Sequence, residues 1–305
     1  MRIVSLLPAA TEICYALGLG GEIVGVSPEC DYPPAAKGMP VVSRVRLDSA
    51  GKTSAETSRM VGEALAEGNA LYDVDERALQ DAAPDVILTQ GLCEVCAPSV
   101  GDVRAVASHL SRRPKILSLD PHTLKDMLED IERVGKACGA PVAARSVVDD
   151  LRDRIERVAF LTGHAHERPK TACLEWLDPL FTAGHWVPEM VELAGGTDVL
   201  AKNGQASRRI EPKEVVLASP EVAVLMPCGF HMDRTKAEAP AVTGKPWWRD
   251  LPAARSGRVW LVDGSSFFNR PGPRLVDGLE ILGHILHPEM FPRAPSSKDA
   301  LPWVE

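Results

Sequence analysis

The sequence predicts an α/β fold made of two Rossmann-like lobes with parallel sheets, joined by a single long, rigid helix. Strand and helix patterns alternate through residues 1–120 and alternate again through residues 169–305, while residues 121–168 have the pattern of helices alone. Alternating strands and helices are typical of parallel sheets that carry helices on both faces. A chain of 305 residues is long enough for two separate cores.

The elements of the first lobe follow one another in a regular order. Short apolar runs predict strands, and the segments between them carry helix start and stop signals. We expect strands in RIVSLL, EIVGVS, DVILTQ and PKILSLD, and helices in AATEICYALGLG, VDERALQDAAP and VGDVRAVASHLS. The polar segment 43–71 is too long for an ordinary connection, so it predicts an insertion with its own helix or a lid.

The connecting region has the apolar spacing of two helices. Apolar residues recur at intervals of three and four from Leu124 to Val134, and a second such pattern starts at Pro141 with no further glycine or proline inside it. This period places the apolar residues on one buried helix face. We therefore expect the second helix to be stiff.

The second lobe restarts the alternation. We expect strands in KTACLEW, EVAVLMP and, as the last strand, RVWLVDG, and helices in HWVPEMVELAGG, PKEVVLASP and RLVDGLEILGHIL. The two halves also share an echo, because ALQDAAPDVILTQ resembles VVLASPEVAVLMP in its order of helix, proline, acidic residue and strand.

Composition excludes several functional classes. A net charge of −8 argues against a nucleic-acid partner, since no basic stripe is present to replace phosphate counterions. No apolar run approaches the roughly 20 residues that span a bilayer. The apolar run after Met1 is too short for a secretory signal, so we expect a cytoplasmic protein, or an extracytoplasmic or periplasmic one if a leader has been removed. Seven cysteines cannot all be paired.

Candidate binding residues lie in the loops that follow the strands. Ligands of open parallel sheets bind outside the carboxyl ends of the strands. We expect these loops to line one cavity shared by the two lobes. The candidates are Pro8, Glu29, Cys30, Gln90, Cys93, Cys96, Phe181, His185, Trp186, Cys228, Phe230, Phe267, Phe268 and Arg270.

Three interpretations of the C-x-x-C pair remain open. Cys93 and Cys96 follow DVILTQ directly and suit a redox dithiol, a metal site completed by Cys30, Cys228 or His185, or two small walls of a pocket. The imidazole of His185 suits a ligand to cobalt or another metal, or a hydrogen-bond donor to a loop carbonyl. The candidate metal ligands are therefore Cys93, Cys96 and His185.

The candidate aromatic side chains also have two interpretations. Large rings in loops can stack on a flat ligand or fill the core of the lobe. Recognised catalytic motifs are missing from the sequence: it contains no G-x-S-x-G, no H-E-x-x-H and no P-loop. We therefore expect a binding protein rather than an enzyme, and a nucleophilic Cys93 or Cys96 is the remaining enzymatic hypothesis.

Four segments carry a resemblance to a known family. In order they are IVSLLPAATEICYALGLGGEIVGVSPECDYP, PDVILTQ, DPLFTAGHWVPEMVELAGG and SPEVAVLM. Together they resemble the cobalamin- and iron-chelate-binding proteins of bacterial ABC importers, most nearly the cobalamin-binding members. The resemblance implies two lobes with a rigid connecting helix, no catalysis, and a corrinoid such as cobalamin as the ligand. The alternative is a metal or metal chelate: a siderophore, haem or a bare metal ion.

The chain departs from this family in two ways. At the places of the cobalamin receptor's aromatic residues it keeps Phe181 and the Phe267–Phe268 pair, but it has Val45, Gln90 and Ile210 elsewhere. The resemblance also implies an ABC permease as partner, bound through one glutamate on each lobe.

Those two docking positions hold basic residues in this chain. The equivalent places have Arg77 and Lys213, with Glu76 and Glu214 one residue away. Either a shift of one residue restores the carboxylates, or this chain does not dock in that way.

Overall fold

The computed structural model describes residues 1–47, 49, 51–91 and 97–304 and contains two compact units. Unit 1 comprises residues 1–52, 59–121 and 125–150, and unit 2 comprises residues 53–58, 122–124 and 151–305. Each unit has its own sheet. The predicted α/β class with two Rossmann-like lobes is confirmed.

Unit 1 is built on a four-stranded parallel sheet. Its strands, in spatial order, are β2 (Ile23–Val26), β1 (Ile3–Ser5), β5 (Val86–Thr89) and β6 (Lys115–Ser118). All four lie where the apolar runs predict strands. Because the strands are parallel, the loops after β1, β2 and β5 leave the sheet at one edge.

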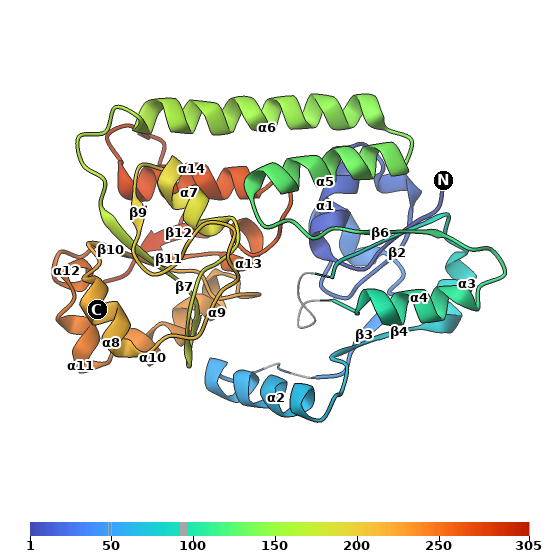
Figure 1. Cartoon of the computed structure of the whole chain (residues 1–305), viewed down its shortest axis with the longest axis horizontal. Helices are drawn as coiled ribbons and strands as arrows, with labels where there is room; N and C mark the ends of the chain where they lie inside the picture. Colours follow the sequence, from blue (N-terminus) through green and yellow to red (C-terminus); the bar gives the residue numbers. More distant parts are fainter. Residues whose placement is uncertain (48, 50, 92–96, 305) are drawn as a thin grey trace. The chain divides into compact units, whose positions relative to one another are not determined.

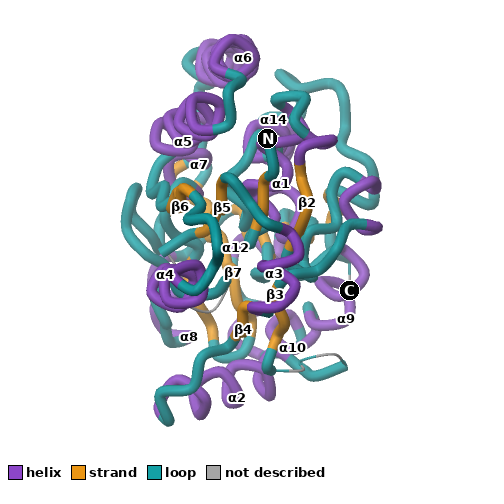
Figure 2. The backbone as a smooth tube through the Cα atoms, turned by 90° about the vertical axis from the view of Figure 1, so that its right-hand side faces the viewer, coloured by secondary structure: helices purple, strands orange, loops and turns teal. Residues whose placement is uncertain are grey.

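Helices cover both faces of this sheet (Figures 1 and 2). On one face, α3 (Glu76–Ala82) and α4 (Val100–Ser108) bury Leu79 and Val103 against Val4 and Ile87. On the other lie α1 (Pro8–Ala16) and α5 (Leu124–Ala137). Gly18, just beyond α1, has a φ of 74°, as the predicted glycine stop requires. Two 3₁₀ helices, η1 (Gly20–Glu22) and η2 (Pro34–Gly38), complete the connections.

The segment 43–71 contains the predicted helix, and a strand on each side of it was not predicted from the sequence. The helix is α2 (Ser54–Ala66), and β3 (Ser43–Val45) pairs antiparallel with β4 (Tyr72–Val74) on either side of it. The backbone N–H and hydroxyl of Ser54 both donate to the Glu238 carboxylate within unit 2. The Glu238 carboxylate therefore holds the first turn of α2, at the amino end of the helix, where a negative charge is favourable.

The connecting helix α6 (Pro141–Thr162) is a single helix of 22 residues, as predicted (Figure 1). Residues 141–150 of it belong to unit 1 and residues 151–162 to unit 2. Within unit 1, α5 and the start of α6 lie side by side (Figure 2). They approach so closely at Gly135 that an added Cβ would come within 3.0 Å of the Ala144 Cβ.

Unit 2 has a six-stranded mixed sheet, whereas the sequence predicted a parallel one. The order along the sheet is β12 (Ala300–Pro302), β11 (Val259–Val262), β10 (Val222–Leu225), β7 (Lys170–Leu177) and β8 (Leu180–Thr182), and β9 (Thr197–Asp198) also pairs with β7. β7, β9, β10 and β11 are parallel, while β8 and β12 run antiparallel. RVWLVDG is therefore not the last strand, because ALP forms an edge strand after it.

Two groups of helices sandwich this sheet (Figure 1). One group is α8 (Pro212–Ala218), α9 (Met232–Glu238), α10 (Pro240–Thr243), α11 (Pro246–Arg249) and α12 (Pro252–Arg255), with Trp248 in the core beneath them. The other is α7 (Val187–Leu193) with α14 (Leu275–Leu286), whose apolar face is buried. The short helix α13 (Gly264–Phe267) follows β11.

The sequence echo corresponds to a repeated structural device. α3 and α8 each end on a residue in the left-handed conformation, and a proline and an acidic residue follow before the next strand. In unit 1, Asp85 accepts from the Arg2 N–H at 2.9 Å and donates its own N–H to the Arg2 carbonyl at 2.8 Å. In unit 2, Glu221 makes the same pair of bonds with Lys170, at 2.8 and 2.7 Å. We call each pair a strand clamp.

Candidate functional site

In unit 1 the loop after β2 is held from inside by a small polar cluster. The Thr11 hydroxyl lies 3.0 Å from Cys30 Sγ and 2.8 Å from Ser5 Oγ, and Ser27 Oγ lies 3.4 Å from the same sulfur. Cys30 is buried. This thiol is therefore part of the interior that shapes the loop.

Three further predicted residues lie at the same edge of the unit 1 sheet. Pro8 occupies the first position of α1, Glu29 accepts a hydrogen bond from the Tyr72 hydroxyl at 3.3 Å, and Gln90 is buried at the end of β5. The predicted Cys93 and Cys96 lie outside the described residues. Beside Cys30 there is a cavity of about 180 Å³, which is smaller than the pockets that enclose drug-sized ligands.

In unit 2 an aromatic group gathers at the carboxyl end of β7. Trp176 and Phe230 meet edge to face with ring centroids 5.2 Å apart, and the Arg234 guanidinium lies 3.8 Å from the centre of the Phe230 ring. Phe181 on β8 is paired directly with Trp176, so both side chains leave the same face of the sheet. Phe230 is buried, whereas Trp176 and Phe181 are half-buried.

The remaining predicted aromatic residues divide between core and surface. Trp186 is buried and donates its indole N–H to the Phe268 carbonyl at 2.8 Å, and the Phe268 ring is also buried. Phe267 is partly exposed, with the Arg274 guanidinium 5.7 Å from its ring centre. Of this group, Phe267 is thus the ring that offers exposed area. Cys228 and Arg270 are partly exposed in the loops after β10 and α13.

His185 lies in a constrained loop before α7. Its φ of 54° is unusual for a residue with a side chain, and hydrogen bonds with Gln205 and Gly204 hold its backbone on both sides. Its ring lies 5.3 Å from that of His122 and 5.6 Å from that of Trp186. Burial, and then the neighbouring His122, lower the pKa of His185, so its imidazole is neutral at neutral pH.

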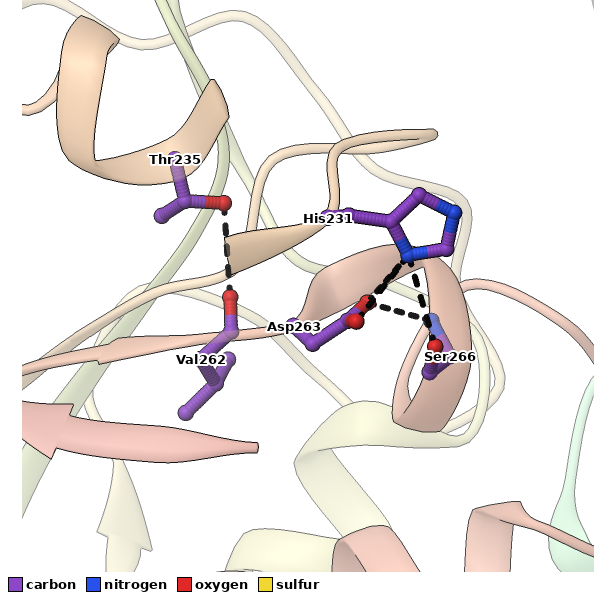
Figure 3. A network of polar contacts seen from close by, with 5 residues as sticks. All are labelled: His231, Thr235, Val262, Asp263 and Ser266. Atoms are coloured by element: carbon purple, nitrogen blue, oxygen red, sulfur yellow. Dashed lines mark hydrogen bonds and ion pairs between the residues drawn. The ribbon is translucent and has the colours of Figure 1, made fainter. Parts of the chain in front are cut away.

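A second histidine lies where β10 and β11 end (Figure 3). His231 Nδ1 is 3.0 Å from Asp263 Oδ2, and Asp263 Oδ1 accepts from the Ser266 N–H at 2.8 Å, which caps α13. Asp263 is mostly buried, while the His231 side chain is 51% exposed. This pair was not predicted, because 32 positions separate the two residues in the sequence. The sequence DGSS, with an N-cap aspartate directly after a strand, is the signal that marks the position.

This cluster is not arranged for nucleophilic catalysis. Ser266 Oγ lies 3.5 Å from His231 Nδ1, the same nitrogen that faces Asp263. A catalytic serine instead needs the opposite imidazole nitrogen, with the carboxylate on Nδ1. The geometry therefore orients a histidine without activating a hydroxyl.

Neither a preformed metal cluster nor a membrane span is present in the described part of the chain. No group of three or more His, Cys, Asp and Glu side chains among those residues is placed to hold a metal ion. No described helix is both long and apolar enough to cross a bilayer.

The two positions expected to dock a permease are on the surface. Arg77 and Lys213 are exposed. Glu76 is exposed at the start of α3, 3.4 Å from His109 Nδ1. Glu214 instead accepts from the Glu211 N–H at 3.0 Å in a capping box and pairs with Arg208 at 2.9 Å.

Comparison with known proteins gives consistent matches over nearly the whole chain. The family described as periplasmic binding protein matches residues 3–265. The vitamin B12-binding protein of Vibrio cholerae is 24% identical over 282 residues, covering 92% of this chain and 86% of that protein.

Two solved structures show the same fold. The periplasmic haem-binding protein RhuT from Roseiflexus sp. RS-1, in apo form, has a TM-score of 0.70 at 20% identity and covers 95% of this chain and 98% of its own. The periplasmic vitamin B12-binding protein BtuF of Vibrio cholerae has a TM-score of 0.68 at 22% identity and covers 93% and 96%.

Proposed function

Because the chain belongs to the periplasmic binding protein family, we propose that it captures a corrinoid, cobalamin or a close analogue, for an ABC importer. Members of the family are non-enzymatic substrate-binding proteins, so the chain is a ligand-binding protein rather than an enzyme. The observation that carries the choice of ligand is the match to the vitamin B12-binding protein of Vibrio cholerae, which extends over 92% of this chain.

The rings of unit 2 support a large, flat ligand. Trp176, Phe181 and Phe267 are only partly buried at the carboxyl edge of the sheet, where ligands of such folds bind. Rigid aromatic side chains bury much apolar area with little loss of rotamer freedom. The shared cavity expected from the sequence stays a prediction, and these three rings all belong to unit 2.

Titration with cyanocobalamin and hydroxocobalamin, followed by absorbance and calorimetry, tests the proposal. We expect saturable binding at micromolar concentrations. Phe181→Ala should weaken it roughly 10-fold, which corresponds to about 1.4 kcal/mol of lost apolar burial. Phe160→Ala is the matched control, because Phe160 is exposed on α6 and does not lie in a loop after a strand. Heat and absorbance that never saturate with either compound would exclude a corrinoid ligand.

A metal or metal chelate, such as haem or a siderophore, is the second candidate ligand. It is favoured by His185, whose burial keeps the imidazole neutral and thus able to donate a lone pair to a metal. The predicted ligands Cys93 and Cys96 would contribute to such a site. Elemental analysis of freshly purified protein separates the two candidates. Stoichiometric metal in the wild type that is lost in Cys93→Ser would support a metal or metal chelate as the ligand. If the wild type contains no metal, this second candidate is excluded.

We also propose that the partner is an ABC permease, met on the extracytoplasmic side of the membrane. Glu76 is the better docking candidate, because the Glu214 carboxylate is already engaged by its capping box and by Arg208. Glu76→Gln should reduce stimulation of the importer's ATPase, while Glu132→Gln on the exposed face of α5 should not. Equal stimulation by wild type and Glu76→Gln would exclude this contact. Cell fractionation tests the location, and recovery in the cytosol alone would contradict it.

A further inference from the structure

A row of three side chains crosses the β8 edge of the unit 2 sheet. Phe181 on β8 is paired with Trp176 on β7 on one side, and an antiparallel bridge pairs it with Arg209 on the other. Residues that are paired directly across antiparallel strands project from the same face of a sheet. The row therefore runs from an indole ring through a phenyl ring to a guanidinium, and we call it the edge row.

The pattern of backbone hydrogen bonds brings Phe181 and Arg209 close together. Bonds of 3.0 and 2.9 Å flank the pair on its two sides, and they join Thr182 with Arg208 and Ile210 with Leu180. This pattern defines a non-hydrogen-bonded pair, the kind in which opposite side chains of an antiparallel ladder lie closer to each other. The guanidinium of Arg209 is thus placed beside the ring of Phe181.

The burial of the neighbouring residues shows which way the edge row faces. Leu180 and Ile210, which are next in sequence to Phe181 and Arg209, are buried in the core cluster of unit 2 that also contains Val215 of α8. Successive side chains of an extended segment point to opposite faces. Phe181 and Arg209 therefore point away from that core.

The two consecutive arginines differ in what they contact. Arg208 lies on the same side as Ile210 and pairs with Glu214 on α8 at 2.9 Å. Arg209 is exposed, and none of the carboxylates in the part of the chain that the structure describes forms an ion pair with it. The charge of Arg208 is therefore used within the fold, whereas that of Arg209 can serve an external group.

The members of the edge row offer a ligand two kinds of contact. The Trp176 indole N–H donates to the carbonyls of Ser54 and Asp178, at 3.2 and 3.1 Å, so this ring offers apolar area rather than a hydrogen bond. A guanidinium presents its N–H donors in a planar fork that matches two oxygens of a carboxylate or a phosphate. The edge row thus suits a flat ligand that carries an oxyanion at its rim.

We propose that Arg209 binds an oxyanion at the rim of the flat ligand and is a specificity-determining residue. This inference rests on the proposed function and deepens it, because it states which chemical group of the ligand is recognised. The oxyanion is the phosphodiester of a complete cobalamin or the carboxylate of a haem side chain. For a corrinoid, Arg209 then favours the complete molecule over one that lacks its nucleotide.

Two pairs of probes test this proposal and distinguish the two sources of the oxyanion. Dicyanocobinamide lacks the phosphate of cyanocobalamin, and the dimethyl ester of haemin lacks the carboxylate charges of haemin. Each compound is titrated into the full chain and followed by its absorption spectrum. Arg209→Gln should weaken binding of the compound with the oxyanion about 10-fold and change binding of its partner by less than about 2-fold. The pair that shows this difference identifies the source.

Two further variants separate recognition of an anion from damage to the fold. Arg208→Gln alters the neighbouring arginine, whose side chain contacts α8, and should change none of the affinities. Arg209→Lys keeps the positive charge but loses the planar fork, so it should lose less affinity than Arg209→Gln. Equal effects of Arg209→Gln on both members of a pair, or no effect on any compound, would overturn the inference alone. Failure of the wild type to bind any of the four compounds would overturn the proposed function as well.

Discussion

Gly135 allows the close approach of α5 and α6 in unit 1, so Gly135→Ala should destabilise the protein. A Cβ at this position would lie within 3.0 Å of the Ala144 Cβ and 3.1 Å from the Ala140 carbonyl oxygen. Both obstacles are buried or belong to the backbone, so neither moves cheaply. Overpacking of this kind costs about 1–3 kcal/mol, while alanine gains about 1 kcal/mol over glycine inside a helix. We expect a net loss of up to about 2 kcal/mol.

Urea denaturation followed by circular dichroism measures this change, and two variants test its cause. Gly62→Ala in α2 adds a methyl group that meets nothing within 4 Å, so it should stabilise by up to about 1 kcal/mol. In Gly135→Ala combined with Ala144→Gly, the methyl group moves from one helix to the other. The double variant should therefore recover most of the loss, with a coupling energy of about 1–3 kcal/mol, equal to the overpacking penalty. If Gly135→Ala stabilised the protein, the reasoning would be refuted, because the helix propensity of alanine would then decide the outcome and not the close contact with Ala144.

Three other predictions concern charge and burial in unit 2. Arg154→Ala removes a bidentate contact with Glu280 and should lower the free energy of unfolding by about 1–2 kcal/mol. The control Arg157→Ala, at an exposed position of the same helix, should change this free energy by less than about 0.5 kcal/mol. Equal losses for the two variants in urea denaturation would contradict the prediction. Burial raises the pKa of Asp198 from 3.8 to about 6, so the folded state holds a proton that the unfolded chain lacks between these values. The free energy of unfolding should therefore fall by up to about 2 kcal/mol as the pH rises from 4 to 6. Asp198→Asn should flatten this part of the plot of stability against pH. An unchanged plot would show that the Asp198 carboxyl is not the cause. Burial also raises the pKa of the Cys173 thiol, so iodoacetamide at neutral pH should label the partly exposed Cys228 and leave Cys173 unmodified, as peptide mass spectrometry will show.

The main elements could be predicted because each has a strong periodic pattern and a clear stop. β1, β5, β7 and β10 are short apolar runs bounded by polar or turn residues, and α14 carries a continuous apolar face. β12 could not be predicted in this way, because ALP is short and its strand conformation depends on pairing with β11. The strand conformation of β8 likewise depends on its pairing with β7.

The candidate site could be predicted only from one general rule, which is that ligands of parallel sheets bind in the loops after the strands. That rule places Cys228 correctly in the loop after β10, whereas Phe181 lies within β8 and Phe267 ends α13. The rule also does not say which side chains turn into the core. Trp186 is buried because its indole nitrogen reaches a carbonyl 82 positions away. The pairing of His231 with Asp263 depends on the adjacency of two parallel strands, a relation that no local pattern encodes.

The strand clamps have a consequence for how this molecule can change over evolutionary time. Each clamp fixes the alignment of neighbouring strands at their amino ends, through an acidic side chain and two main-chain atoms. The loops in which we propose that the ligand binds emerge from the opposite ends of the same strands. Insertions and replacements there can accumulate without sliding one strand past another, so new cargo preferences can arise while the frame keeps its alignment.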